Sequence, residues 1–230
     1  KEWREVKNKK CRLVCIDDIQ NHHYSADIVI NHSPSVRESD FSLDPGTKLL
    51  LGTQYALLRK EFLEAAKIPP VEPATDSLLL AFGGGDKNKL ALRYADLITG
   101  IDPDIPLTII TGAASGSYND LEQWSIGNNR ERKVKIYANQ SAAQLVSLLQ
   151  DSSCCLLPAS GMMYEALSIR RPLITGYFVP NQQKIARDII KDEGGIFYLG
   201  DLNTSDNTGL KKIISQIKKI HFPDLAAYQS

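Results

Sequence analysis

The chain has 230 residues, 43% of them hydrophobic, so its length allows one large domain or two small ones with a sizeable core. Lys and Arg together number 27, as do Asp and Glu, and the formal net charge is zero. This balance argues against a general electrostatic surface for nucleic acids or anionic membranes. We therefore expect no nucleic-acid partner, and any anionic ligand must be bound by local groups.

The four cysteines lie in apolar, strand-like runs and lack the spacing of a structural zinc site; they are Cys11, Cys15, Cys154 and Cys155. Cysteines in such runs are typical of a reducing compartment, so we expect a cytoplasmic protein without a metal site. No apolar stretch approaches the roughly 20 residues of a membrane span, and residues 1–10 lack the apolar part of a signal peptide.

The N-terminal part begins with short apolar runs, CRLVCIDD, ADIVINH and KLLLG, which predict three strands, and RKEFLEAAK predicts a helix that closes this region. The prolines of IPPVEPATDS cannot continue that helix. We therefore expect a partial lobe at 1–68, a linker at 69–77, a second lobe at 78–220 and a tail at 221–230. The first lobe has few strands for a doubly wound sheet, which suggests a missing segment in front of Lys1.

From Leu78 onward, short apolar runs alternate with amphipathic segments, the pattern of βα units that build a parallel sheet covered by helices. Near-continuous apolarity suits strands buried on both faces, at 78–82, 107–111, 133–138, 154–158, 172–178 and 196–199. Between them, SAAQLVSLLQ places Leu145 and Leu149 on one helix face, and NQQKIARDIIKDEGG predicts a helix with Asn181 as N-cap and Gly194 as its stop. The predicted fold class is α/β with parallel sheets.

Ligands of parallel sheets bind beyond the carboxyl ends of the strands, so the loops that follow the strands are candidate sites. Gly83, Gly84, Gly85 and Asp86 follow the strand at 78–82 and match neither G-x-G-x-x-G nor a P-loop. The glycines form either a tight turn or a backbone that comes close to a phosphate-bearing ligand, with helix amides pointing at the anion.

Two further loops of the second lobe carry polar candidates. Ser160 and Gly161 open a helix after CCLLP, and Ser160 is either an ordinary N-cap or part of a ligand site. Glu165, one turn later, could accept hydrogen bonds from the two hydroxyls of a ribose. Asn181 and Gln182 either begin the next helix or bind sugar hydroxyls or an acetamido group through their amides.

The first lobe offers Asp17 and Asp18 after its first strand, with His22 and His23 nearby. Asp17 stands where a site residue is expected, although surface turns use Asp as readily. His23 or His22 could act as a general base, but loop histidines are usually solvated.

Five segments, taken together in this order, resemble the PseG-like hydrolases of the pseudaminic acid pathway: IDDIQNHHYSADIVIN, LLGTQYALLRKEF, FGGGDKNKLAL, PASGMMYEAL and FVPNQQKIA. The likeness covers most of the chain from Cys11 to about Gly195. That family is similar to GT-B glycosyltransferases of the MurG type. The resemblance therefore implies two Rossmann-like lobes, the N-terminal one incomplete here, with UDP held mainly by the C-terminal lobe.

The reaction implied by the resemblance is hydrolysis of UDP-2,4-diacetamido-2,4,6-trideoxy-β-L-altropyranose, in which water attacks the anomeric carbon and UDP leaves without a cofactor. The resemblance assigns UDP to Gly83, Gly84, Gly85, Asp86, Ser160, Gly161 and Glu165. It assigns the sugar to Tyr55, Asn181 and Gln182.

The family's base is a histidine in an N-terminal G-x-G-H-like segment, which these 230 residues lack. The catalytic residue is therefore unknown, with Asp17 and His23 as the remaining candidates, and the chain is either a fragment or a relative without the base. A UDP-sugar-dependent glycosyltransferase and a non-catalytic nucleotide-sugar binding protein are the alternative functions. The sugar isomer and the oligomeric state are left open.

Overall fold

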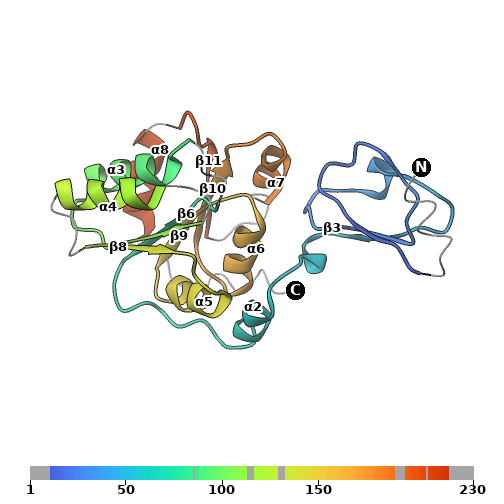
Figure 1. Ribbon diagram of the computed structural model, residues 1–230, viewed down its shortest axis with the longest axis horizontal. Helices are drawn as coiled ribbons and strands as arrows, with labels where there is room; N and C mark the ends of the chain where they lie inside the picture. The colour runs from blue at the N-terminus through green and yellow to red at the C-terminus, as the bar shows by residue number, and fades with distance from the viewer. Residues whose placement is uncertain are drawn as a thin grey trace. The chain divides into compact units, whose positions relative to one another are not determined.

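The computed structural model describes residues 11–84, 86, 88–112, 117–128, 133–189, 195–205 and 207–217 (Figure 1). The chain divides into two compact units, Lys1–Leu57 (unit 1) and Leu58–Ser230 (unit 2). Each unit is built around its own parallel sheet.

Unit 1 contains a three-stranded parallel sheet in the order β1-β3-β5, which confirms the three strands expected there. These strands are β1 (Val14–Ile16), β3 (Ile28–Asn31) and β5 (Lys48–Leu51). A second parallel pair joins β2 (His23–Tyr24) to β4 (Ser42–Leu43), and two 3-10 turns are η1 (Glu38–Asp40) and η2 (Thr53–Tyr55). A small core of Tyr24, Ala26 and Val29 lies between these parts.

Unit 2 contains a six-stranded sheet in the order β11-β10-β9-β6-β7-β8, all parallel, and every strand predicted from Leu78 onward is confirmed. The strands are β6 (Leu78–Ala81), β7 (Leu107–Thr111), β8 (Val134–Ala138), β9 (Cys154–Pro158), β10 (Leu173–Tyr177) and β11 (Ile196–Asp201). Counted from β6, this is the strand order 3-2-1-4-5-6 of a doubly wound Rossmann-type sheet. The topological switch point lies between β6 and β9, where successive crossovers leave in opposite directions.

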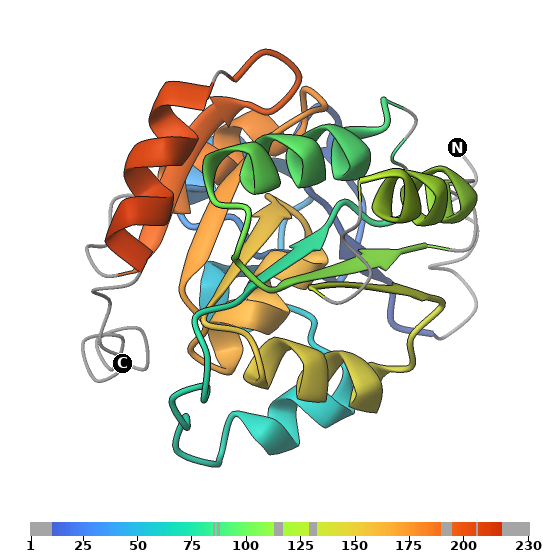
Figure 2. The ribbon, with the colours of Figure 1, turned by 90° about the vertical axis from the view of Figure 1, so that its left-hand side faces the viewer.

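Helices cover both faces of the unit 2 sheet: α2 (Lys60–Ala65), α3 (Leu90–Ile101), α4 (Ser117–Gly127), α5 (Ala142–Gln150), α6 (Gly161–Ser168), α7 (Gln182–Asp188) and α8 (Asn207–Ile217). Figure 2 shows α3, α4 and α8 on one side of the sheet and α2, α5 and α6 on the other. Alternate strand residues such as Leu78 and Leu80 pack toward Tyr94 and Ile98 of α3. Both faces of β6 are buried, which explains its unbroken apolar run.

The apolar interior also contains the adjacent pair Cys154 and Cys155. Burial raises the pKa of Cys155 to about 12, so its thiol stays protonated at neutral pH. These two cysteines therefore act as small apolar side chains, as the sequence predicts.

Helix α2 differs from the expected grouping, because the sequence assigned it to the lobe at 1–68 and the structure assigns it to unit 2. Its buried residues, Phe62 and Ala65, pack on the side formed by α5 and α6. The larger unit offers this short helix an apolar surface that buries its stripe, whereas the sequence shows only that the stripe exists. The linker expected at 69–77 therefore follows the unit boundary instead of forming it.

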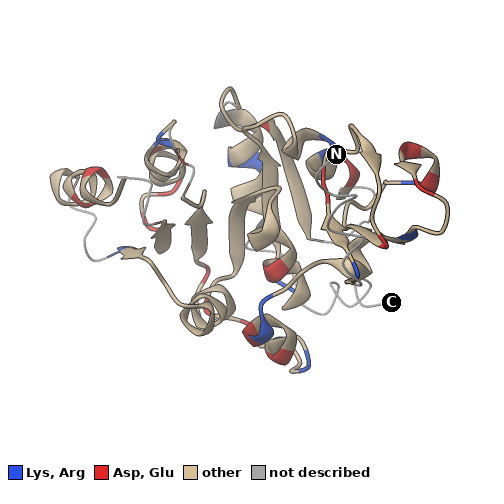
Figure 3. Ribbon diagram, turned by 45° about the vertical axis from the view of Figure 1, so that its right-hand side comes forward, with Lys and Arg blue, Asp and Glu red and all other residues tan. Residues whose placement is uncertain are grey.

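No helix among the described residues is long and apolar enough to cross a membrane. Basic and acidic residues are spread over several helices (Figure 3), in line with the neutral composition.

Candidate functional site

The loops after β6 and β9 flank the topological switch point of unit 2, which is the position where doubly wound sheets bind their ligands. Both loops were singled out from the sequence. After β6, Gly83 has a φ of +72°, a conformation that favours glycine. Gly85 lies outside the described residues.

Gly84 lies against a second loop, the one that follows β7. A Cβ atom built on Gly112 would be 2.5 Å from the Gly84 Cα and 2.7 Å from its nitrogen. The two loops therefore touch backbone to backbone, and a side chain at Gly112 would push the β6 loop aside. Gly112 is thus required for packing, because any side chain there would collide with the β6 loop.

Asp86 has a different role from the one expected. Its side chain is buried, and its carboxylate accepts hydrogen bonds from the backbone nitrogens of Leu90 (2.7 Å) and Ala91 (2.9 Å). It thereby caps the first turn of α3, where a negative charge also suits the helix dipole. A carboxylate committed in this way supplies no donor to a diphosphate, so we take Asp86 out of the ligand-binding set.

The N-terminus of α6 follows β9 directly. Ser160 is at the N-cap position in an extended conformation, yet its side chain makes no capping hydrogen bond. Gly161 is exposed, and a Cβ built on it would meet nothing within 4 Å. Ser160 is therefore the N-cap residue by position, one of the two predicted alternatives, but its side chain does not cap the helix. The first turn of α6 begins beside open space at Gly161.

Glu165 lies one turn further along α6 and is almost fully buried. Arg59, the residue before α2, donates from Nε to Oε1 and from Nη2 to Oε2, both at 2.6 Å. The Arg59 guanidinium also stands 5.1 Å from the centre of the Phe62 ring. The hydrogen bonds to Glu165 raise the pKa of Arg59, so this cation is permanently charged.

The loop after β10 brings Asn181 and Gln182 to the same carboxyl edge of the sheet. Asn181 is exposed and already helical, with φ −65° and ψ −21°, and its side chain does not cap α7. Gln182 closes the turn instead, because its Oε1 accepts a hydrogen bond from the Phe178 nitrogen at 3.1 Å. Asn181 is at the N-cap position of α7, as predicted, but its side chain makes no capping hydrogen bond. Gly194 lies outside the described residues.

The candidates from unit 1 are mostly occupied by local contacts. Asp17 Oδ2 accepts hydrogen bonds from the nitrogens of Ile19 (3.2 Å) and Gln20 (2.9 Å), which is the surface-turn role. His23 uses both ring nitrogens, with Nδ1 2.7 Å from Ser42 Oγ and Nε2 2.8 Å from Asp44 Oδ1. Both side chains are therefore held by contacts within unit 1.

Tyr55 is in η2, after β5, and is 38% exposed. It therefore lies at the carboxyl edge of the unit 1 sheet, the edge at which parallel sheets bind ligands.

A polar cluster not predicted from the sequence lies at the carboxyl end of β3, the central strand of the three-stranded sheet of unit 1. Asn31 is 1% and Ser33 4% exposed, and Asn31 Oδ1 accepts a hydrogen bond from the Ser33 nitrogen at 2.9 Å. Within the described chain, Asn31 Nδ2 and Ser33 Oγ are buried without a hydrogen-bond partner. Burial lowers the pKa of the intervening His32, against the opposing effect of Asp18. The run NHS following an apolar strand was the available signal.

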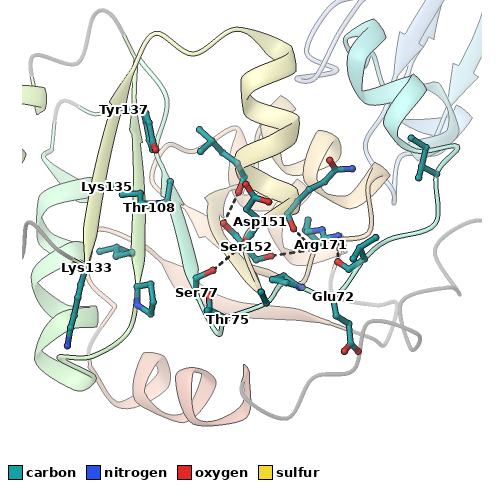
Figure 4. A pocket seen from close by; sticks show the side chains of 18 of the residues that line it. Glu72, Thr75, Ser77, Thr108, Lys133, Lys135, Tyr137, Asp151, Ser152 and Arg171 are labelled. Carbon is teal, nitrogen blue, oxygen red and sulfur yellow. Dashed lines mark hydrogen bonds between the residues drawn. The ribbon is translucent and has the colours of Figure 1, made fainter.

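A cavity of about 810 Å³ lies at the opposite, amino-terminal edge of the unit 2 sheet. Figure 4 shows Thr108, Lys135 and Tyr137 on one side of it and Ser152 and Arg171 on the other. The buried Arg171 donates hydrogen bonds to the backbone oxygens of Gln150, Ser152 and Val71, at 3.0, 3.4 and 3.1 Å. These contacts hold the proline-rich segment against the sheet, and none of the residues predicted to bind ligand lines this cavity.

Comparison with known sequences places the chain near two curated proteins, and no family model matches it. It is 27% identical over 178 residues to the UDP-2,4-diacetamido-2,4,6-trideoxy-beta-L-altropyranose hydrolase of Campylobacter jejuni, covering 76% of this chain and 60% of that protein. It is 25% identical over 172 residues to an uncharacterised protein of Methanocaldococcus jannaschii, covering 72% of this chain and 35% of that protein. The chain thus spans about a third to three-fifths of these relatives.

Among solved structures, MurG of Acinetobacter baumannii matches with a TM-score of 0.57 at 12% identity, over 97% of this chain and 63% of MurG. The pneumococcal O-GlcNAc transferase GtfA, solved with UDP and GlcNAc, matches with a TM-score of 0.53 at 15% identity, over 88% of this chain and 40% of the transferase. At these identities the likeness concerns the fold. The chain has the α/β fold of GT-B glycosyltransferases, with parallel sheets in both of its units.

Proposed function

We propose that the chain is the nucleotide-sugar-binding part of an enzyme that hydrolyses a UDP-linked 2,4-diacetamido-2,4,6-trideoxyhexose. The hydrolase of Campylobacter jejuni supports the reaction, and the UDP complex of GtfA supports the ligand class for this fold. The observation that carries the proposal is the arrangement on α6: the uncapped Ser160–Gly161 turn beside the switch point, with the buried carboxylate of Glu165 one turn behind it.

In this proposal the backbone supplies most of the attraction for the diphosphate. The amides at the start of α6 and the backbone at Gly83 are assigned to the phosphates, because an added Cβ at Gly161 or Gly83 would meet nothing within 4 Å. Such a site needs few basic side chains, which agrees with a chain of zero net charge. Glu165 then accepts hydrogen bonds from the ribose hydroxyls, and Asn181 and Gln182 are assigned to the sugar.

Hydrolysis requires a base for the attacking water and stabilisation of the departing diphosphate. The α6 amides and the β6 loop serve the second requirement. For the first we assign no residue, and Asp17 and His23, which are held by contacts within unit 1, stay candidates only.

A UDP-sugar-dependent glycosyltransferase is the second candidate, since the solved structures with this fold that are cited above are transferases. The two candidates differ in what releases UDP. A hydrolase releases UDP from the nucleotide-sugar in water alone, whereas a transferase needs an acceptor. A protein that only binds the nucleotide-sugar is stabilised by UDP and shows no turnover.

The test is a thermal-shift titration of the chain with UDP, UMP and ATP, followed by a UDP-release assay on the same sample. We expect UDP to raise the melting temperature more than UMP or ATP. Equal shifts with all three nucleotides, or no shift, would remove the nucleotide-sugar proposal. UDP release without an acceptor identifies the hydrolase.

A further inference from the structure

The pairing of Arg59 with Glu165 assigns a role to a residue outside the predicted site. Glu165 has 8% of its side chain exposed, and the two bonds from Arg59 are the hydrogen bonds that its carboxylate accepts within the described residues. A carboxylate buried to this extent requires a partner, because an isolated buried charge is strongly unfavourable. Arg59 supplies this partner across both oxygens.

The fixed geometry of Arg59 gives the carboxylate one orientation. A guanidinium binds a carboxylate through two parallel N–H···O bonds, which a lysine ammonium cannot reproduce. Arg59 is itself positioned at the start of α2, where the buried Phe62 lies beneath its guanidinium. Helix α2 packs on α6, so the two ends of the ion pair belong to elements in direct contact.

A count of hydrogen-bond sites suggests what the paired carboxylate can still bind. An ionised carboxylate has about four acceptor positions, two on each oxygen. Arg59 uses one on each oxygen, which leaves one on each oxygen for further donors. Two neighbouring hydroxyl groups match this remaining pattern. A phosphate does not, because it brings acceptors and because the carboxylate would repel it.

We propose that Arg59 is a positioning residue that orients the Glu165 carboxylate toward the vicinal diol of a ribose, and so makes the site prefer ribonucleotides to 2′-deoxyribonucleotides. This inference rests on the proposed function, since it concerns the nucleotide part of the same ligand. Arg59 acts through Glu165 and makes no contact with the reacting atoms.

The experiment measures the affinities of UDP and 2′-deoxy-UDP by calorimetry for the wild-type chain and for Arg59→Met, Arg59→Lys and Lys67→Met. The wild type should prefer UDP by about 10- to 100-fold, the effect of one hydrogen bond to a charged acceptor. Arg59→Met should reduce this ratio to about one, and Arg59→Lys should give an intermediate ratio. Lys67→Met removes the cation of an exposed ion pair with Glu64 near the other end of α2, and should leave the ratio unchanged.

Arg59→Met leaves a buried carboxylate without its partner and can fail to fold, so the double variant Arg59→Met/Glu165→Gln provides a second measurement. It removes both charges, and it should fold and bind UDP and 2′-deoxy-UDP with a ratio near one. A ratio unchanged from the wild type in any folded Arg59→Met variant would show that Arg59 is only structural.

The outcomes separate this inference from the proposed function. A wild-type chain that binds UDP and 2′-deoxy-UDP equally would overturn the ribose role of the pair and leave UDP binding intact. A chain that binds neither nucleotide removes the proposed function and this inference with it.

Discussion

Arg59 and Glu165 are 106 positions apart in the sequence and form a two-point ion pair with both N···O distances at 2.6 Å. The pair joins the start of α2 to the middle of α6, the helix that follows β9. Glu165 is buried, while 42% of the Arg59 side chain is exposed. The contribution of this pair to stability depends mainly on Glu165. Glu165 is the charge that is left buried without a partner when Arg59 is replaced.

Replacing Arg59 alone should therefore cost more stability than replacing both members of the pair. We expect Arg59→Met to lower the free energy of unfolding by about 1–3 kcal/mol. The double variant Arg59→Met/Glu165→Gln should recover a large part of this loss. Urea denaturation of Arg59→Met, Glu165→Gln and the double variant measures the coupling, and strictly additive losses would show that the two residues do not interact in solution.

The close contact between Gly112 and Gly84 predicts that adding a methyl group at Gly112 lowers the stability of unit 2. Gly112→Ala should destabilise unit 2, because the new methyl group overlaps the backbone of the β6 loop. Gly100→Ala is the control, since Gly100 is inside α3 with nothing within 4 Å of the added atom. It should raise stability by about 0.5–1 kcal/mol. A tolerated Gly112→Ala would mean that the two loops are further apart than described.

Removing the buried hydroxyl of Ser33 should not lower stability, unlike the removal of most buried hydroxyl groups. Since Ser33 Oγ has no described partner, Ser33→Ala should leave the free energy of unfolding unchanged or raise it by up to about 1 kcal/mol. Ser152 is the matched control, because its Oγ is hydrogen-bonded to the Leu148 oxygen at 2.8 Å. Ser152→Ala should cost about 1 kcal/mol. A comparable loss in Ser33→Ala would reveal a bound water or another partner for its hydroxyl.

His32 predicts a loss of stability in mild acid. Burial lowers its folded-state pKa below the ordinary value of 6.5, so the unfolded chain binds the proton more readily. The contribution of neutral His32 to the free energy of unfolding is fully present above about pH 6.5. It is lost as the pH falls through the folded-state pKa of His32. Melting temperatures of wild type and His32→Gln at pH 7.5 and 5.5 measure this, and the variant should lose less on acidification. Parallel losses would remove His32 as the cause.

Replacing Arg171, which lies away from the proposed ligand site, should cause a large loss of stability. Arg171→Met should destabilise unit 2 by about 2–4 kcal/mol, because three backbone oxygens lose their buried donor. Lys135→Met, on an exposed residue that lines the same cavity, should change stability by less than about 0.5 kcal/mol. Denaturant unfolding compares the two, and UDP binding by the folded Arg171→Met chain should be unchanged.

The apolar runs of the sequence determined the strands almost residue by residue. A buried parallel strand must be apolar on both faces, and in this chain the runs LTIIT and CCLLP coincide with β7 and β9. The alternation of strands and helices also determined the parallel fold class, because a parallel connection needs a crossover. The loops after β6 and β9 followed from the same reasoning, since ligand loops lie at the carboxyl ends of such strands.

The tertiary structure alone decided which side chains in those loops remain available to a ligand. The sequence does not reveal that Asp86 caps α3, that Gln182 rather than Asn181 closes its turn, or that α2 packs on α6. Nor does it reveal the pairing of Arg59 with Glu165. Hydrogen bonds and ion pairs of this kind depend on where each backbone carries its side chains, and distant segments meet only once the sheet and its helices have packed. Local periodicity records which residues must be buried, and it carries no information about which polar groups will meet there.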